Sequence, residues 1–221
     1  MRWIVLAGIF ITFEGIDGCG KTTQMRLLAE RLHREGISCV LTREPGGTPI
    51  GDAIRALLLS PTSQMTPQTE VYLYAASRAE HVQAVILPAL MRGDIVLCDR
   101  FYDASIAYQG YGIGKLGGIS PAFVEAVNTP ALANVKPDLT FLFDLPVEVA
   151  KKRMKGRTGQ EDRIEQRGEA FFARVQEGLQ TIVAQEPNRV CKLDATKEIE
   201  EVAKEVYRHT KRIIEEAGST R

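Results

Sequence analysis

Paired cysteines and an excess of charge of one sign are both absent from the sequence. The four cysteines, Cys19, Cys39, Cys98 and Cys191, stand singly, which argues against a C-x-x-C zinc site or redox dithiol and favours a reducing cytoplasmic location. The 28 basic and 28 acidic residues give a formal net charge of zero, so no surface-wide attraction to nucleic acid or to a membrane is expected. Any anionic ligand must be held by local charge.

Long apolar runs, repeats and low-complexity segments are also missing. No run approaches the roughly 20 apolar residues that span a bilayer. The apolar start MRWIVLAGIFITF continues into a glycine-rich stretch without a cleavage site, so no targeting segment is expected. With 221 residues and no visible linker, the chain is expected to form a single domain over 1–221.

Short apolar runs alternate with helix-like stretches along the chain. The runs are IFITF, SCVLT, DIVLCD, LTFLFD and RVCKLD, and helices are predicted over 21–34, 49–59, 67–91, 146–155 and 197–216. Strands that alternate with helices, and that are apolar nearly throughout, are typical of an α/β fold with a parallel sheet covered on both faces. In the longest helical pattern, Thr66 can cap the helix and Pro88 is expected to bend or end it.

A glycine-rich segment follows the first apolar run. Residues 15–22, GIDGCGKT, match G-x-x-x-x-G-K-[ST] between a predicted strand and a predicted helix, the context in which backbone amides cradle the phosphates of a nucleoside triphosphate. Lys21 is expected to reach the β and γ phosphates, and the Thr22 hydroxyl is expected to ligate Mg²⁺. The predicted triphosphate-binding residues are Gly15, Ile16, Asp17, Gly18, Cys19, Gly20, Lys21, Thr22 and Thr23.

Two further segments carry phosphate-binding signals of different strength. Asp99 ends the apolar run DIVLCD, where doubly wound sheets place their ligands, so it is predicted to hold the magnesium shell, with Arg100 beside it as a phosphate clamp. The segment GIGKLG at 112–117 matches G-x-G-x-x-G but lacks a strand before it and a good helix after it. A loop is expected there.

Three classes of triphosphate-binding protein can be compared with the sequence. A GTP-driven switch should carry an N-K-x-D guanine-reading motif, which is absent, and a nucleic-acid motor should carry a basic stripe. A phosphoryl transferase to a small acceptor needs arginines near two phosphate groups, and arginines occur at 43, 78, 100 and within 153–167. A kinase is favoured, while a kinase for another small acceptor and a regulatory nucleotide-binding protein without transferase activity stay open.

Several motifs together resemble the bacterial thymidylate kinases, a family of nucleoside monophosphate kinases. FEGIDGCGKTT, TREPGGTPIG, AASRAEH, DRFYDASIAYQGYG, PDLTFLFDLP and EDRIEQ occur in that family's order. The resemblance implies a P-loop kinase fold, in which a five-stranded parallel sheet is flanked by helices on both faces and a short lid lies at about 153–167. It implies ATP-dependent phosphorylation of dTMP to dTDP with Mg²⁺. It also implies a homodimer formed through the helix at 67–91, whose apolar content the core would explain equally well.

The same resemblance assigns contacts to the base and the sugar of dTMP. Tyr74 would stack on thymine and Arg78 would bind its carbonyl edge, and these residues share one helix face because they lie four apart. Ser105 and Gln109 would face the base edge. Tyr108 would press against the sugar where a ribose 2′-hydroxyl would clash, which would account for a deoxyribose preference.

The phosphate and the 3′-hydroxyl of dTMP have their own expected contacts. Arg43 and Arg100 would hold the acceptor phosphate, and Pro45 would shape the loop at 43–49. Asp17 would accept a hydrogen bond from the 3′-hydroxyl. The attacking group would be the phosphate of dTMP itself, which is largely ionised at neutral pH, so no general base would be needed.

A lid arginine is expected to contact the transferring phosphoryl group. Gly18 occupies the glycine-loop position that carries this arginine in the other type of the family, so the lid must supply it. The candidates are Arg153, Arg157 and Arg163. No histidine is needed for catalysis, and the three histidines are expected on solvated helix faces: His33, His81 and His209.

Overall fold

The computed structural model describes residues 8–155 and 161–219, and its centre is one parallel sheet of order β2-β3-β1-β4-β5. The strands are β1 Ile9–Glu14, β2 Cys39–Arg43, β3 Ile95–Asp99, β4 Leu139–Asp144 and β5 Val190–Asp194. In register, Phe13 of β1 pairs with Asp99 of β3 and with Phe141 of β4. The carboxyl ends of the three middle strands therefore meet at one edge of the sheet.

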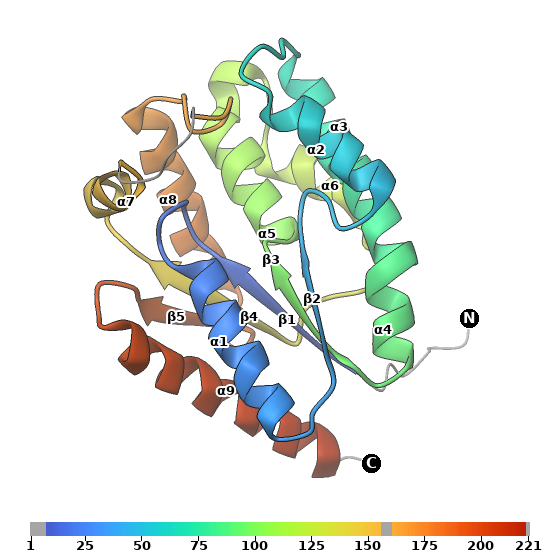
Figure 1. The fold of residues 1–221 in the computed structure, drawn as a ribbon. Helices are drawn as coiled ribbons and strands as arrows, with labels where there is room; N and C mark the ends of the chain where they lie inside the picture. The colour runs from blue at the N-terminus through green and yellow to red at the C-terminus, as the bar shows by residue number, and fades with distance from the viewer. Residues whose placement is uncertain (1–7, 156–160, 220–221) are drawn as a thin grey trace.

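Helices cover both faces of the sheet (Figure 1). They are α1 Lys21–Arg34, α2 Pro49–Leu59, α3 Pro67–His81, α4 Leu87–Met91, α5 Tyr102–Ser105, α6 Pro121–Ala131, α7 Val147–Met154, α8 Glu169–Gln185 and α9 Ile199–Ser219. Helices α1 and α9 pack together on one face, and α4, α5 and α8 lie on the other. The predicted α/β fold with a five-stranded parallel sheet is confirmed.

Alternate side chains of β1 enter the two layers of the core. Ile11 and Phe13 are fully buried in the cluster that includes α1 and α9, whereas Phe10 is fully buried in the cluster under α4. Thr12 and Glu14 are polar but equally buried, at 0 % and 1 % exposed. A parallel strand covered on both faces is expected to be apolar, so these two polar residues need partners inside the protein.

The long helix predicted at 67–91 is interrupted. Thr66 caps α3 as expected, because its hydroxyl accepts from the Thr69 amide at 3.2 Å. The chain then forms a π-helix, Val82–Ile86, before α4. Pro88 cannot donate a backbone hydrogen bond, and the widened turn directly precedes it. The break therefore comes earlier than Pro88 itself.

The glycine cluster at 112–117 is helical, and the expected loop is wrong. A π-helix, Ile106–Ile113, runs into a 3₁₀ turn, Gly114–Gly117. A Cβ at Gly112 would come within 2.5 Å of Phe171 on α8. This glycine lets the π-helix pack closely against α8, which explains its presence without a phosphate ligand.

Candidate active site

Three glycines shape the loop between β1 and α1. Gly15, Gly18 and Gly20 have φ values of 135°, 83° and 96°, a region that residues with a Cβ rarely adopt. Gly20 is the N-cap of α1 and offers no side chain to cap it, so the first-turn amides of a 14-residue helix are left for another acceptor. The Lys21 ammonium donates to the carbonyl oxygens of Gly15 and Ile16 at 3.1 and 3.0 Å.

The two predicted magnesium ligands lie side by side. The Thr22 hydroxyl donates to Oδ2 of Asp99 at 2.7 Å. Thr22 begins α1 and Asp99 ends β3, and the β1–β3 pairing brings these ends together. Among the described residues, no group of three or more His, Cys, Asp or Glu side chains could hold a metal. A cation here would therefore need oxygen atoms from a ligand or from water as well.

Arg100 connects the glycine loop to a second site. Its Nη2 donates to Oδ1 of Asp17 at 2.9 Å, and its guanidinium carbon lies 4.8 Å from the ring centre of Tyr108. Burial lowers the pKa of Arg100, but Asp17 and other acidic neighbours outweigh it and hold that pKa well above its usual value. Its backbone is left-handed, with φ 69°, a conformation that costs about 1–3 kcal/mol in non-glycine residues and is concentrated at functional sites.

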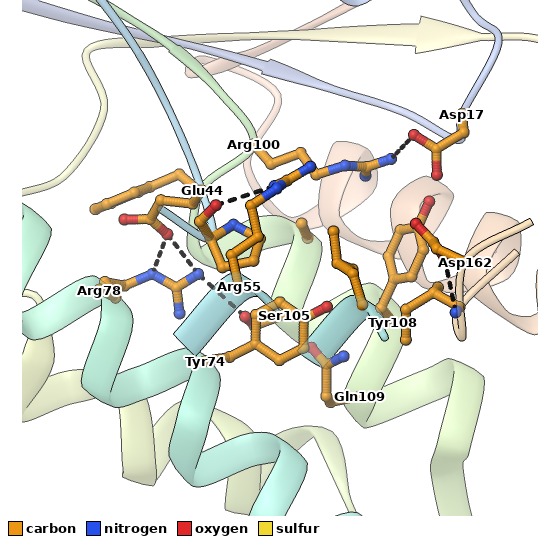
Figure 2. Close-up of a pocket in the computed structure, with 15 residues that line it drawn as sticks. Asp17, Glu44, Arg55, Tyr74, Arg78, Arg100, Ser105, Tyr108, Gln109 and Asp162 are labelled. Carbon is orange, nitrogen blue, oxygen red and sulfur yellow. Dashed lines mark hydrogen bonds and ion pairs between the residues drawn. The ribbon is translucent and has the colours of Figure 1, made fainter. Parts of the chain in front are cut away.

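A pocket opens on the other side of Arg100 (Figure 2). It is lined by Asp17, Glu44, Pro45, Arg55, Leu59, Tyr74, Arg78, Arg100, Phe101, Ala104, Ser105, Tyr108, Gln109, Asp162 and Ile164. Eight residues predicted to bind dTMP are in this set, drawn from the glycine loop, β2–α2, α3, β3–α5 and the π-helix. The ninth, Arg43, is outside it. Sequence positions as far apart as 17 and 109 thus share one cavity.

A buried polar network anchors one wall of the pocket. Arg78 is 1 % exposed and donates to Glu44 from Nε at 2.8 Å, to Ser105 from Nη2 at 3.1 Å, and to Asn128 from Nη1. Glu44 also binds Nδ1 of His81 at 3.0 Å. His81 is fully buried, so the expectation that it lies on a solvated face is wrong: a helix pattern cannot show that its partner comes from the β2–α2 loop.

Tyr74 and Gln109 form another part of the wall. Burial raises the pKa of the Tyr74 hydroxyl, and the nearby Glu70 raises it further, so the ring presents a neutral face. Gln109 is 1 % exposed and donates from Nε2 to Oε1 of Glu70 at 2.9 Å. Glu70 was not singled out in the sequence, where it reads as an ordinary acidic residue of a helix first turn.

Arg55 is a site residue that the sequence analysis missed. It lies on α2, lines the pocket, and donates from Nη1 to the Pro45 carbonyl at 3.0 Å. Burial and the neighbouring Arg43 lower its pKa. Arg43 itself is half-exposed, 3.5 Å from Asp52. No local pattern around Arg55 indicates a binding role. Only the packing of α2 in the folded protein brings this side chain to the pocket.

The lid candidates are placed differently from one another. Arg153 donates to the carbonyl oxygen of Ala195, after β5, at 3.1 Å. Arg163 donates to the Leu58 carbonyl and to Glu70, each at 2.7 Å. Arg157 lies outside the residues that the structure describes. The expected contact of one of these with the transferring phosphoryl stays a prediction.

A glycine loop that opens a helix at the switch point of a parallel sheet, facing a pocket with arginines, defines a P-loop kinase that moves a phosphoryl group to a small acceptor. The family model for thymidylate kinase matches residues 13–206. The chain therefore belongs to the thymidylate kinase family, and it phosphorylates dTMP to dTDP using ATP.

Relatives and solved structures agree with this family. A thymidylate kinase from an Exiguobacterium species is 51 % identical over 214 residues, which are 96 % of this chain and 99 % of the relative. One from Pseudomonas fluorescens is 48 % identical over 198 residues, 89 % and 92 % of the two chains. The crystal structure of thymidylate kinase from Ehrlichia chaffeensis has a TM-score of 0.73 at 36 % identity and covers 92 % and 98 %. In the part of the chain described, no helix is long and apolar enough to span a bilayer.

Proposed function

We propose that ATP and dTMP bind on opposite sides of the Asp17–Arg100 ion pair. Asp17 belongs to the glycine loop and also lines the pocket. Arg100 follows Asp99, which contacts Thr22, and lines the same pocket. This shared border is the observation that supports the proposal, because a direct transfer needs the two phosphate ends to meet at one place.

On the ATP side, the loop Gly15–Thr23 would hold the phosphates with its amides, including those of Ile16, Gly18 and Cys19. Lys21 would exchange its two carbonyl partners for phosphate oxygens. Thr22 and Asp99 supply a hydroxyl and a carboxylate oxygen 2.7 Å apart, which suits the hard oxygen ligands of Mg²⁺ together with phosphate and water. When bound, Mg²⁺ would neutralise charge on the triphosphate.

On the dTMP side, aromatic side chains would pack against the base and the sugar, and polar side chains would bind the edge of the base. Tyr74 would stack on the base, with Arg78 and Ser105 at its carbonyl edge and Gln109 facing the ring nitrogen. Tyr108 would stand against C2′ of the sugar. The phosphate-binding residues proposed are Arg100, Arg55 and Arg43, with Pro45 holding the loop and Asp17 accepting from the 3′-hydroxyl.

The transfer itself needs positioning rather than proton removal. A phosphate oxygen of dTMP forms a bond to the γ-phosphorus, and the bond from that phosphorus to the β–γ bridging oxygen breaks, which gives dTDP and ADP. Lys21 and Arg100 would offset charge on the equatorial oxygens. Arg163 would first have to leave Glu70, so we favour Arg157 or Arg153 as the lid arginine.

Measurement of ADP release with a panel of acceptors tests the proposal. Wild-type protein is expected to release ADP most efficiently with dTMP, less with dUMP and dCMP, and not with thymidine. The Lys21→Ala variant is expected to lose turnover while it still binds dTMP in calorimetry, because Lys21 does not line the dTMP pocket. Preferred use of another acceptor, or loss of dTMP binding in Lys21→Ala, would contradict the assignment of the two sides.

We also propose a cytoplasmic homodimer that uses α3 and its neighbours. The apolar residues Val82 and Ile86 are fully buried in the core and cannot serve as contacts. Tyr72 on α3 is 54 % exposed, with its ring centre 6.2 Å from that of Phe123 on α6. Light scattering of wild type and Tyr72→Glu should give a dimer and a monomer, and a wild-type monomer would refute the proposal. The free state of all four cysteines agrees with a reducing compartment.

A further inference from the structure

Glu70 receives hydrogen bonds from three side chains in two distant parts of the chain. It is 1 % exposed in the first turn of α3. Its Oε2 accepts from Arg163 at 2.7 Å and from Arg167 at 2.6 Å, and its Oε1 accepts from Nε2 of Gln109 at 2.9 Å. Glu70 does not line the dTMP pocket, but Gln109 does. The carboxylate therefore stands behind the wall and acts through the residue in front of it.

The chemistry of this carboxylate decides which way the Gln109 amide faces. An amide side chain has an acceptor end and a donor end of nearly the same shape, and either could point to a ligand. A carboxylate that already faces two guanidinium groups can only accept, so the amide nitrogen must turn towards Glu70. The opposite end, Oε1 of Gln109, is buried and has no hydrogen-bond partner among the described residues. The pocket wall thus presents an acceptor.

An acceptor at this point selects the base by its ring nitrogen. The N3 position of thymine carries a hydrogen and can donate, whereas N3 of cytosine is itself an acceptor and would face Oε1 with two lone pairs opposed. A buried polar atom left without its partner costs more than a typical hydrogen bond contributes. The orientation of one amide can therefore discriminate strongly between two pyrimidines of similar shape.

We propose that Glu70 is a positioning residue that fixes Gln109 with its acceptor end towards N3 of the pyrimidine. This inference rests on the proposed binding of dTMP in the pocket. Arg163 and Arg167, in the C-terminal part of the lid segment, hold the carboxylate in place, so the same interaction ties base selection to the docking of residues 161–168.

The test compares dTMP with 5-methyl-dCMP, which keeps the methyl group and the sugar but turns N3 from a donor into an acceptor and replaces the O4 carbonyl by an amino group. The variants below leave Arg78 at that carbonyl edge unchanged, so a change in the preference reports on N3. In Glu70→Gln, the new amide can donate to Oε1 of Gln109 and allow the Gln109 amide to rotate. The KM for dTMP is expected to rise about tenfold with kcat changed much less, and the dTMP preference in kcat/KM is expected to fall about tenfold. Glu70→Asp, which keeps an acceptor-only group, should retain the preference.

Two controls separate this role from general support of the fold. Gln109→Met leaves Glu70 and its arginines intact and should lose the same preference, and adding Glu70→Gln to it should have no further effect on the preference. Arg167→Gln removes one cation and should leave the preference as in wild type. A wild-type ratio in Glu70→Gln or in Gln109→Met would overturn the inference. Wild-type protein without dTMP turnover would instead overturn the proposed function on which it rests.

Discussion

The hydroxyl of Thr22 lies 2.7 Å from Oδ2 of Asp99, although the two residues are 77 positions apart. The contact follows from the topology, because β1 and β3 are parallel neighbours and the chain leaves both strands at the same edge. It places a hydroxyl and a carboxylate beside the glycine loop, where the charge of a triphosphate is concentrated.

Replacement of Asp99 by Asn tests the magnesium site. The amide keeps the shape and can still accept from Thr22, but it removes the negative charge that would orient the magnesium shell. The Mg²⁺ concentration for half-maximal activity is expected to rise about 10- to 100-fold, measured by ADP release at fixed ATP. Asp94→Asn, just before the other end of β3, is the matched control and should not shift it. An unchanged magnesium requirement in Asp99→Asn would refute the assignment.

Arg55 and Arg43 are expected to contribute differently to binding of the acceptor phosphate. Arg55 lines the pocket and is partly buried, and a charged hydrogen bond in such a place contributes about 1.5–3 kcal/mol. Arg55→Met should therefore raise the KM for dTMP about 10- to 100-fold. The Arg43–Asp52 pair is more than half exposed on both sides, where such pairs contribute about 0–1 kcal/mol. A larger KM effect for Arg43→Met than for Arg55→Met would show that the loop rearranges around dTMP.

The parts of the fold that depend on local pattern could be predicted from the sequence. The apolar runs gave all five strands, since strands buried on both faces carry a continuous signal. The glycine loop was recognised because both its residues and its setting are local, with a strand before it and a helix after it. Asp99 could be placed near Thr22 because parallel topology requires it.

The buried polar residues could not be predicted from the sequence, for a different physical reason. His81 is predicted on a solvated face, and Glu44 and Glu70 carry no local signal of burial, yet each of the three is at most 3 % exposed. Their partners lie from 34 to 97 residues away, and no periodicity encodes such pairings. Arg55 was missed because the packing of α2, and not a local sequence pattern, brings it to the pocket. Buried polar networks are specified by tertiary packing, so they can be recognised only in the folded structure.

Arg78 is expected to matter for stability as well as for binding. Its removal would leave the buried Glu44 carboxylate, 3 % exposed, with the His81 ring as its remaining side-chain hydrogen-bond partner. Breaking a buried pair in this way costs about 3–5 kcal/mol. Arg78→Met should therefore lower the free energy of unfolding in urea by this amount, whereas Arg92→Met, whose pair with Asp94 is formed by a 60 % exposed arginine side chain, should lower it by less than about 1 kcal/mol. Equal effects would show that the buried network adds little.

Glu14 should make stability fall as pH rises. Burial, with a further contribution from Asp103, raises the pKa of Glu14 from 4.5 to about 8, against the opposing effects of Arg100 and Lys21. Its Oε1 accepts from the Phe101 amide at 2.7 Å. Between these two pKa values the folded protein holds a proton that the unfolded chain releases. The stability that protonated Glu14 contributes is therefore fully present below the pKa of Glu14 in the unfolded chain. It is lost as the pH rises through the pKa of Glu14 in the folded protein.

Glu14→Gln removes this dependence while it keeps an oxygen for the Phe101 amide. Between about pH 5.5 and about pH 7.5, wild type is expected to lose up to about 3 kcal/mol of unfolding free energy relative to the variant, since one pKa unit corresponds to about 1.4 kcal/mol. Urea denaturation at the two pH values measures the difference, and other titrating groups cancel because both proteins contain them. Glu30→Gln on the exposed face of α1 is the control, and its unfolding free energy should change with pH as that of wild type does. The same change with pH in Glu14→Gln and in wild type would mean that Glu14 is already ionised in the folded protein.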